Sequence, residues 1–409
     1  MNETQLLEIM DEGLALQRKG RLEAARAKYQ QVLDVAEGSV AVAARFNLGV
    51  VCCLLKRWAE CVEHLTPVVQ HDPHDWEALY SLAWAEECMG KRSDAIFHYR
   101  SAAAQTPTNP ELLGRFAFCL ISRSYEVVEN SRPELIKEAE KVLNEAQRAG
   151  PRDGYVLWSC AHLHYVKNEL KEALKLFLET VSVDAGFTDA HFYAGIVLGM
   201  LGRFKDSADR FTEAIRTGHD TAETWFYLGV SLYHQNKFPE ARSAWEKTIL
   251  KNPCYKDAYY NLFVLFHKNM KNVELALDVC RKGIHHFPDD EGLIRRLADV
   301  LASRKRWAEV LPLAQKLASF APEDGRKQWN LGVVLERLGS SAEAEKAYGI
   351  AIHLGFSGPK TAVTVSAGSS AASARSQEER DYARQYLFDQ FLIYGVRPFS
   401  RPDWRKTPE

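Results

Sequence analysis

Residues 222–255 read AETWFYLGVSLYHQNKFPEARSAWEKTILKNPCY, and this stretch decides the fold. Apolar residues recur at helical spacing between Trp225 and Leu232. After a polar break at 235–237, a second apolar stripe runs from Ala241 to Ile249. Pro253 ends that stripe, because proline is excluded from the interior of a helix. The stretch therefore predicts two helices joined by a tight turn.

Prolines repeat the same pattern along the chain. They fall at Pro73, Pro107, Pro151, Pro253, Pro288 and Pro322. The first and last gaps are both 34 residues, and the gap from Pro151 to Pro253 is 102 residues, or three times 34. A fixed period of this length is typical of a solenoid, in which each copy of one unit contacts only its neighbours. We therefore expect function to lie on an extended surface and not in one pocket.

Small side chains recur at two positions of this unit, with Ala222 counted as position 1. Position 8 is small in nine of ten copies: Gly13, Gly49, Ala83, Ala117, Ala161, Gly195, Gly229, Ala298 and Gly332. Position 20 is also small in nine: Ala25, Cys61, Ala95, Ala139, Ala173, Ser207, Ala241, Ala276 and Ala344. Small residues let helix backbones approach closely. Position 24 is large in Tyr29, Tyr99, Phe177, Phe211, Trp245 and Tyr348, and we expect it to fill the space between hairpins.

This pattern resembles the tetratricopeptide repeat (TPR), with its large-aromatic, leucine-glycine, alanine, aromatic, alanine and proline signature. The resemblance implies an all-α fold, a right-handed α-solenoid of helix-turn-helix hairpins over residues 1–358. We place ten copies, at 6–39, 42–75, 76–109, 110–153, 154–187, 188–221, 222–255, 256–290, 291–324 and 325–358.

Three repeats depart from the pattern. The fourth has about ten extra residues, at about 124–133. The eighth has Phe263 at position 8 and one extra residue near Lys271, and the ninth has Val310 at position 20. We therefore expect an irregular seam between repeats at about 260–310.

The repeat pattern stops after Leu354. Residues 359–376 are rich in serine and alanine and predict a flexible linker. Residues 377–395 predict an amphipathic helix, either a cap on the last repeat or a docking helix for another subunit. The tail at 396–409 contains three prolines and is expected to be extended, with Phe399 and Trp404 among basic residues.

Composition excludes several classes of protein. The net charge of −2 gives no reason to expect nucleic acid as a partner. The eight cysteines fall mostly within expected helices, where they are predicted to act as small apolar residues in a reducing compartment. The first ten residues do not resemble a secretory signal, and no stretch is apolar enough for a membrane helix. These features predict a cytoplasmic protein that is not inserted in a membrane.

The resemblance also implies where a partner binds. In TPR arrays, positions 2, 5, 6 and 9 of the first helix usually face a bound peptide in a concave groove. Position 5 is often aromatic: Phe46, Tyr80, Trp158, Phe192, Phe226, Tyr260 and Trp329. Position 2 is often acidic (Glu77, Glu111, Asp189, Glu223 and Asp257), and position 6 is asparagine at Asn47, Asn261 and Asn330. An aromatic and acidic groove would bind a segment with lysine or arginine near apolar side chains. Alternatively, these residues are ordinary repeat consensus and contact no ligand.

A pair of arginines, Arg295 and Arg296, interrupts this pattern in the ninth repeat. One interpretation is a basic step that binds a carboxylate, and the other is a solvated helix face. The clamp by which some TPR co-chaperones hold a terminal carboxylate is not assembled. Asn47 matches its middle asparagine, but Met10 and Glu77 stand at other clamp positions.

No phosphate loop, nucleophile elbow or metalloprotease motif occurs, so we expect neither catalysis, cofactor nor metal. The favoured function is a non-catalytic scaffold or adaptor that binds other proteins, with a ciliary or cytoskeletal complex as the preferred setting. The alternative is a cargo receptor for peptide motifs, or a co-chaperone-like adaptor.

Overall fold

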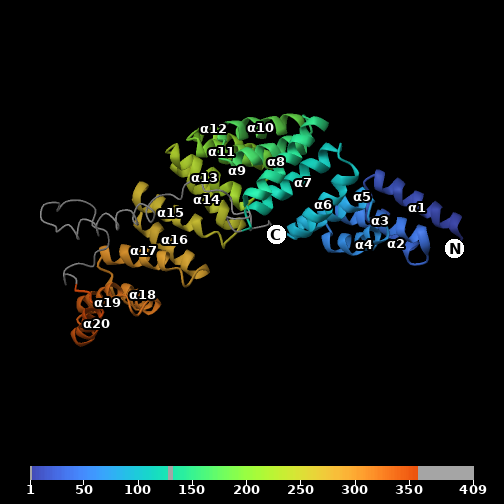
Figure 1. Ribbon diagram of the computed structural model, residues 1–409. Coiled ribbons are helices and arrows are strands. Elements are labelled where there is room, and N and C mark those ends of the chain that lie inside the picture. Colours follow the sequence, from blue (N-terminus) through green and yellow to red (C-terminus); the bar gives the residue numbers. More distant parts are fainter. Residues whose placement is uncertain (1, 128–131, 358–409) are drawn as a thin grey trace. The chain divides into compact units, whose positions relative to one another are not determined.

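The computed structural model describes residues 2–127 and 132–357, and these residues form an all-α solenoid of successive helix pairs (Figure 1). They divide into two compact units, with the boundary between Val197 and Leu198. The first unit contains α1 (Glu3–Arg18), α2 (Leu22–Leu33), α3 (Gly38–Leu54), α4 (Trp58–His71), α5 (Trp76–Cys88), α6 (Arg92–Gln105), α7 (Pro110–Ser124), α8 (Arg132–Ala149), α9 (Gly154–Val166), α10 (Leu170–Val183) and most of α11 (Thr188–Met200).

The second unit continues with nine further helices and one π-helical turn, Leu265–Asn269. Its helices are α12 (Phe204–Arg216), α13 (Ala222–His234), α14 (Phe238–Lys251), α15 (Lys256–Val264), α16 (Val273–His286), α17 (Glu291–Ser303), α18 (Trp307–Phe320), α19 (Gly325–Arg337) and α20 (Ser341–His353). Odd-numbered helices are the first helices of the predicted repeats, and even-numbered helices are the second. The all-α hairpin fold predicted from the sequence is confirmed.

Position 8 needs a small residue because the residue at position 24 lies directly against it. A Cβ built on Gly229 would lie 2.5 Å from Nε1 of Trp245, and one on Gly13 would lie 2.6 Å from the Tyr29 ring. Trp245 is fully buried, and its Nε1 donates a hydrogen bond to the Phe226 carbonyl at 3.1 Å. The size of the ring at position 24 therefore limits what position 8 can hold.

The turn inside eight of the hairpins uses a left-handed residue. Glycine takes this conformation at Gly20, Gly90, Gly202 and Gly339. Lys56, Asn168, Asn236 and Lys305 take it in other repeats, with φ between 60° and 63°. A non-glycine residue is strained there, because its Cβ approaches the following carbonyl oxygen. The chain therefore accepts local strain in order to keep the same turn in these repeats.

The eighth repeat contains the π-helical turn, which follows α15 directly. The amide of Met270 donates to the carbonyl of Leu265, and the ring of Phe263 stacks on that of His267 with their centroids 5.3 Å apart. Phe263 is buried, so this repeat places a large ring where its relatives place a small residue. The insertion expected at about 124–133 lies between α7 and α8, partly outside the described residues. The predicted linker, C-terminal helix and tail also lie outside them.

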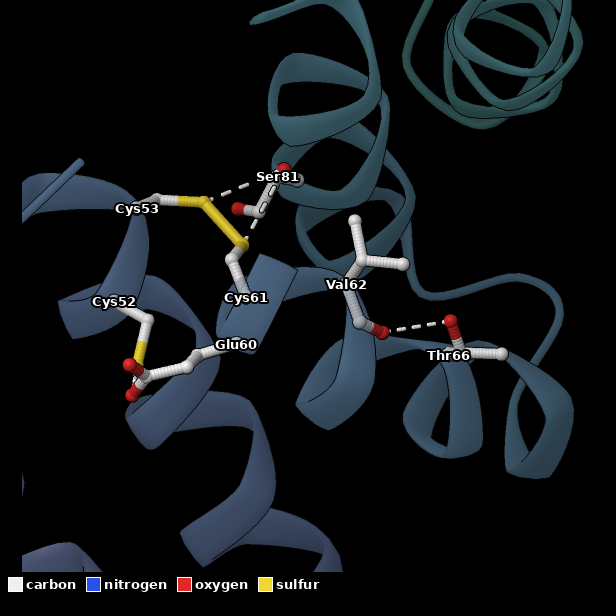
Figure 2. The surroundings of a disulfide bond; sticks show 7 residues. All are labelled: Cys52, Cys53, Glu60, Cys61, Val62, Thr66 and Ser81. Carbon is white, nitrogen blue, oxygen red and sulfur yellow. Dashed lines mark hydrogen bonds between the residues drawn. A yellow bond between two sulfur atoms is a disulfide. The ribbon is translucent and has the colours of Figure 1, made fainter. Parts of the chain in front are cut away.

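Two of the eight cysteines depart from the expectation of simple packing. Cys53 of α3 and Cys61 of α4 form a disulfide with their Cα atoms 5.6 Å apart (Figure 2). Both side chains are buried beside the carbonyl of Ser81 on α5. The prediction of small apolar cysteines holds for the buried free thiols Cys52, Cys119, Cys160 and Cys280. The two cysteines occupy positions 12 and 20 of the second repeat, and the repeat pattern did not predict that they form a disulfide.

No helix among the described residues is long and apolar enough to cross a membrane. Over the same residues, no group of three histidine, cysteine or acidic side chains could hold a metal ion.

Candidate functional site

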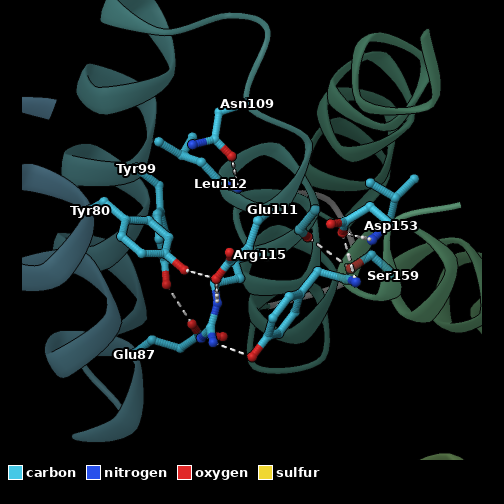
Figure 3. A network of polar contacts seen from close by, with 12 residues as sticks. Tyr80, Glu87, Tyr99, Asn109, Glu111, Leu112, Arg115, Asp153 and Ser159 are labelled. Carbon is cyan, nitrogen blue, oxygen red and sulfur yellow. Dashed lines mark hydrogen bonds and ion pairs between the residues drawn. The ribbon is translucent and has the colours of Figure 1, made fainter. Parts of the chain in front are cut away.

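Three consecutive first helices bring one polar and aromatic cluster together in the N-terminal unit. Tyr80 of α5 donates its hydroxyl to Glu111 of α7 at 2.6 Å (Figure 3). Arg115, one turn after Glu111, lies 3.5 Å from the same carboxylate and donates to the hydroxyl of Tyr155 on α9. With Trp84 of α5, these residues form what we call the α5–α7–α9 site.

Aromatic rings surround the guanidinium of Arg115. Its Cζ lies 4.0 Å from the ring centroid of Tyr155, 4.5 Å from that of Trp84 and 5.8 Å from that of Tyr80. Only 12% of the Arg115 side chain is exposed. Cation–π attraction strengthens when the cation is removed from water, so these rings hold the charge in place. The site thus contains a fixed internal cation among the rings of the two repeats that flank its own.

The helix ends put these side chains in register. Asp75, Asn109 and Asp153 cap α5, α7 and α9 by accepting hydrogen bonds from backbone amides of the first turn. Between α7 and α9 the backbones almost touch, since a Cβ on Gly114 would lie 2.8 Å from the carbonyl carbon of Tyr155. Ser159 also donates to the Gly114 carbonyl at 2.8 Å. Glycine at this position therefore lets Arg115 reach Tyr155.

Charges below the site balance this cation. Glu87 is half-buried and accepts a hydrogen bond from the Tyr99 hydroxyl at 2.8 Å. Burial raises the pKa of Glu87, and the Arg115 charge and the Tyr99 hydroxyl oppose that rise. Burial would lower the pKa of Arg115, but the surrounding tyrosines and Glu87 raise it above its ordinary value. Arg115 therefore stays cationic, and the half-exposed carboxylate of Glu111 lies beside it.

The predicted acidic residues of this site are accessible. Half of the Glu111 side chain is exposed, and Glu77, one turn before Tyr80 on α5, is also exposed. Tyr80 itself is half-buried. Burial and the hydrogen bond to Glu111 raise the pKa of its hydroxyl, so Tyr80 remains a donor at neutral pH. Glu77, Tyr80 and Glu111 are thus brought to one face by α5 and α7.

Most other predicted aromatic residues are buried. These are Trp158, Phe192, Phe226, Tyr260 and Trp329, each at most 8% exposed. The ring of Trp158 lies against His162, Phe177 and Tyr193, with centroids 4.3, 5.6 and 5.5 Å away. Those of Phe226 and Trp329 lie against Tyr255 and Tyr348. Their burial agrees with the alternative of ordinary repeat packing. Phe46 and Tyr80 differ from them, because both are only half-buried.

The remaining predicted residues divide by exposure. Asp189, Arg295 and Asn330 are exposed, Asn47, Glu223 and Asp257 are half-buried, and Asn261 is fully buried. Arg295 pairs with Glu291 on its own helix. Arg296 is buried, with its guanidinium 4.3 Å from the ring centroid of Tyr260. The arginine pair is therefore not one basic surface.

Arg296 belongs to a second network of the same design in the C-terminal unit. Tyr260 donates its hydroxyl to Asp290, which also pairs with Lys256 at 3.0 Å. In both units a tyrosine at position 5 donates to a carboxylate, and its ring lies against an arginine at position 6 of the next repeat. Trp84, Arg115, Tyr155 and Asp290 were missed as site residues. The sequence feature that could have indicated these networks is a tyrosine at position 5 of one repeat followed by an arginine at position 6 of the next repeat.

A family model described as tetratricopeptide repeat matches residues 10–60 and 194–259. The chain contains tetratricopeptide repeats. Human protein O-mannosyl-transferase TMTC3 is 25% identical over 264 residues, 63% of this chain and 27% of that protein. The probable UDP-N-acetylglucosamine–peptide N-acetylglucosaminyltransferase SPINDLY of Hordeum vulgare is 25% identical over 170 residues, 40% of this TPR chain and 17% of that protein. Because the TPR chain spans so little of either relative, the likeness does not carry their activities over.

Among solved structures, a monomeric mutant of IFIT1 with Gppp-AAAA is similar, with a TM-score of 0.53 and 15% identity. The match covers 87% of the TPR chain and 82% of that chain. At this identity the likeness establishes the fold alone. TPR repeats are typically non-catalytic interaction modules, so the repeats indicate a scaffold for protein–protein interaction.

Proposed function

We propose that this TPR protein is a non-catalytic scaffold or adaptor in a multiprotein assembly, and that the α5–α7–α9 site binds a basic, aromatic-containing segment of a partner. The observation that carries the proposal is the exposed carboxylate of Glu111 beside the half-buried ring of Tyr80. A protein segment rather than nucleic acid is the favoured ligand, because the accessible charges of the site are the carboxylates of Glu77 and Glu111, whereas Arg115 is largely buried.

The chemistry of recognition follows from this arrangement. Glu111 still has lone pairs available after accepting from Tyr80, so it can accept a charge-assisted hydrogen bond from a lysine or arginine. The aliphatic part of that side chain, or a neighbouring aromatic residue, would lie on the rings of Tyr80 and Trp84. Because Arg115 is held by three rings, it is fixed before the partner arrives and little order must be gained on binding.

The test is affinity capture from source cells with the Glu77→Arg/Glu111→Arg variant. Its matched control is Glu172→Arg, which reverses an exposed carboxylate on the second helix α10 of the same unit. We expect the double variant to lose the captured proteins and the control to keep them. If the double variant captures the same proteins in the same amounts, the α5–α7–α9 site is not the partner site.

The same capture separates the two modes of binding. Loss of a varied set of proteins that share a basic-aromatic motif supports the peptide-receptor alternative. Loss of one stoichiometric set supports the scaffold. The Phe192 and Phe226 rings are unsuitable targets for this test, because both are buried and their truncation would damage the fold.

The preference for a ciliary or cytoskeletal assembly is a separate hypothesis. Imaging of the tagged protein in ciliated cells tests it. Concentration at the cilium or its base supports that setting, and a uniform distribution contradicts it.

A further inference from the structure

We propose that the C-terminal segment 396–409 of the same chain binds the α5–α7–α9 site and competes there with the partner. The inference rests on the proposed function, since it names a resident ligand for the site. It would make partner binding conditional on displacement of the segment.

Charge complementarity is the first argument. The segment reads VRPFSRPDWRKTPE, with four basic and two acidic side chains. The site offers Glu77 and Glu111 as exposed carboxylates, whereas its cation Arg115 is largely buried. The basic residues of the segment alternate with two large rings, Phe399 and Trp404. Carboxylates beside tyrosine and tryptophan rings suit both kinds of side chain.

Spacing is the second argument. Three prolines in fourteen residues favour a polyproline-like extended backbone, which rises about 3.1 Å per residue. Arg397, Arg401 and Arg405 recur every fourth residue, so neighbouring members are about 12 Å apart in that conformation. The long arginine side chains at this spacing can reach carboxylates on two different helices, and Glu77 on α5 and Glu111 on α7 offer such a pair, since Tyr80 of α5 donates a hydrogen bond to Glu111.

The prolines also lower the entropic cost of binding. Proline fixes φ, so an extended segment loses less conformational freedom than an ordinary peptide when it is held. Extended recognition of this kind uses aromatic-lined grooves.

The tether is the third argument. Residues 358–395 connect the described part of the chain to the segment, and a chain of 38 residues spans at most about 125 Å. Such a tether makes binding of the segment intramolecular, so a partner must compete with it at an effective concentration that the tether sets.

The experiment uses the full-length chain with p-benzoylphenylalanine in place of Phe399. Irradiation followed by peptide mapping should attach the segment to α5 or α7, in a product that migrates as one chain. Glu77→Arg/Glu111→Arg should abolish this cross-link and Glu172→Arg should preserve it. Reversal of the three tail arginines to glutamate, added to the double variant, should restore it. A cross-link elsewhere in the chain, or one unaffected by the double variant, refutes the inference. A product of two chains also refutes it, since the segment would then serve a second copy.

Partner capture distinguishes this inference from the proposed function. Arg397→Glu/Arg401→Glu/Arg405→Glu in the full chain should raise capture on the order of tenfold, because the competitor is removed. Unchanged capture from this variant refutes the competition, while loss of capture in Glu77→Arg/Glu111→Arg would leave the proposed function standing. If the cross-link maps to the site but Glu77→Arg/Glu111→Arg keeps its partners, the proposed function is refuted, whereas binding of segment 396–409 at the site still holds.

Discussion

Replacement of Gly229 by alanine tests the packing rule on which every hairpin depends. The added Cβ would lie 2.5 Å from Nε1 and 2.6 Å from Cδ1 of Trp245. Neither ring atom can yield easily, because Trp245 is fully buried and tied to the Phe226 carbonyl. The indole must shift, or α13 and α14 must move apart.

The size of the effect follows from three contributions. Overpacking of a core costs about 1–3 kcal/mol. Loss of the indole hydrogen bond costs about 1 kcal/mol, and the better helix propensity of alanine returns about 1 kcal/mol. We therefore expect Gly229→Ala to destabilise the C-terminal unit by about 2 kcal/mol. Gly349→Ala is the matched control, because no atom outside its own helix lies within 4 Å of its added Cβ. That change should stabilise α20 slightly.

Hydrogen exchange of amides in α13 and α14 is the appropriate assay, because a repeat array need not unfold in one step. A loss of 2 kcal/mol corresponds to exchange about 30-fold faster. Adding Trp245→Phe should relieve the clash, since it recreates the alanine and phenylalanine pair found at Ala161 and Phe177. Slower exchange in Gly229→Ala, or no relief in the double variant, would refute the packing rule.

Three further outcomes are expected. Lys305→Gly should raise the free energy of unfolding by about 1 kcal/mol in urea denaturation, because the lysine is strained at φ 60°; a loss of stability would contradict this. Gly114→Ala should weaken partner capture and destabilise the packing of α7 on α9 by about 1–3 kcal/mol, since the added Cβ would lie 2.8 Å from the carbonyl carbon of Tyr155. Capture equal to that of the wild type would argue against a role of the close α7–α9 approach in partner binding. Burial lowers the pKa of His162 to about 3, so this histidine takes up a proton at a lower pH in the folded state than in the unfolded state. The contribution of neutral His162 to the free energy of unfolding should be complete above about pH 6.5 and fall toward pH 3, by at most ~1.4 kcal/mol per pH unit. His162→Gln should reduce this pH dependence in urea titrations at several pH values.

The fold was predictable because the repeat encodes its own packing. Gly13 and Tyr29, or Gly229 and Trp245, stand sixteen residues apart in the sequence and in direct opposition in the structure. A pattern copied through the chain makes each such pair visible many times. The π-helical turn was less predictable, since the sequence indicated only an extra residue near Lys271.

The candidate site was predictable only in part, because register assigns a helix face but not an exposed surface. Tyr80 and Trp158 share position 5, yet Tyr80 is half-buried and Trp158 is enclosed by neighbouring rings. The difference depends on side chains from the following repeat. Tyr80 is followed by the partly exposed Glu111 of the next repeat, whereas Tyr193 of the next repeat lies against Trp158. Such neighbours vary from one repeat to the next.

Comparison of the two tyrosine–carboxylate–arginine networks indicates which of them is suited to a partner. In both, aromatic rings hold a largely buried arginine, so the cation braces adjacent repeats. The carboxylates differ. Asp290 is only 11% exposed and is already paired with Lys256, whereas the Glu111 side chain is 50% exposed. A buried, neutralised carboxylate offers nothing to a ligand, while an accessible one fixed by Tyr80 and Arg115 offers a charge at a defined position. The network in the C-terminal unit is therefore a structural brace, and this difference supports our proposal that a basic segment binds at the α5–α7–α9 site.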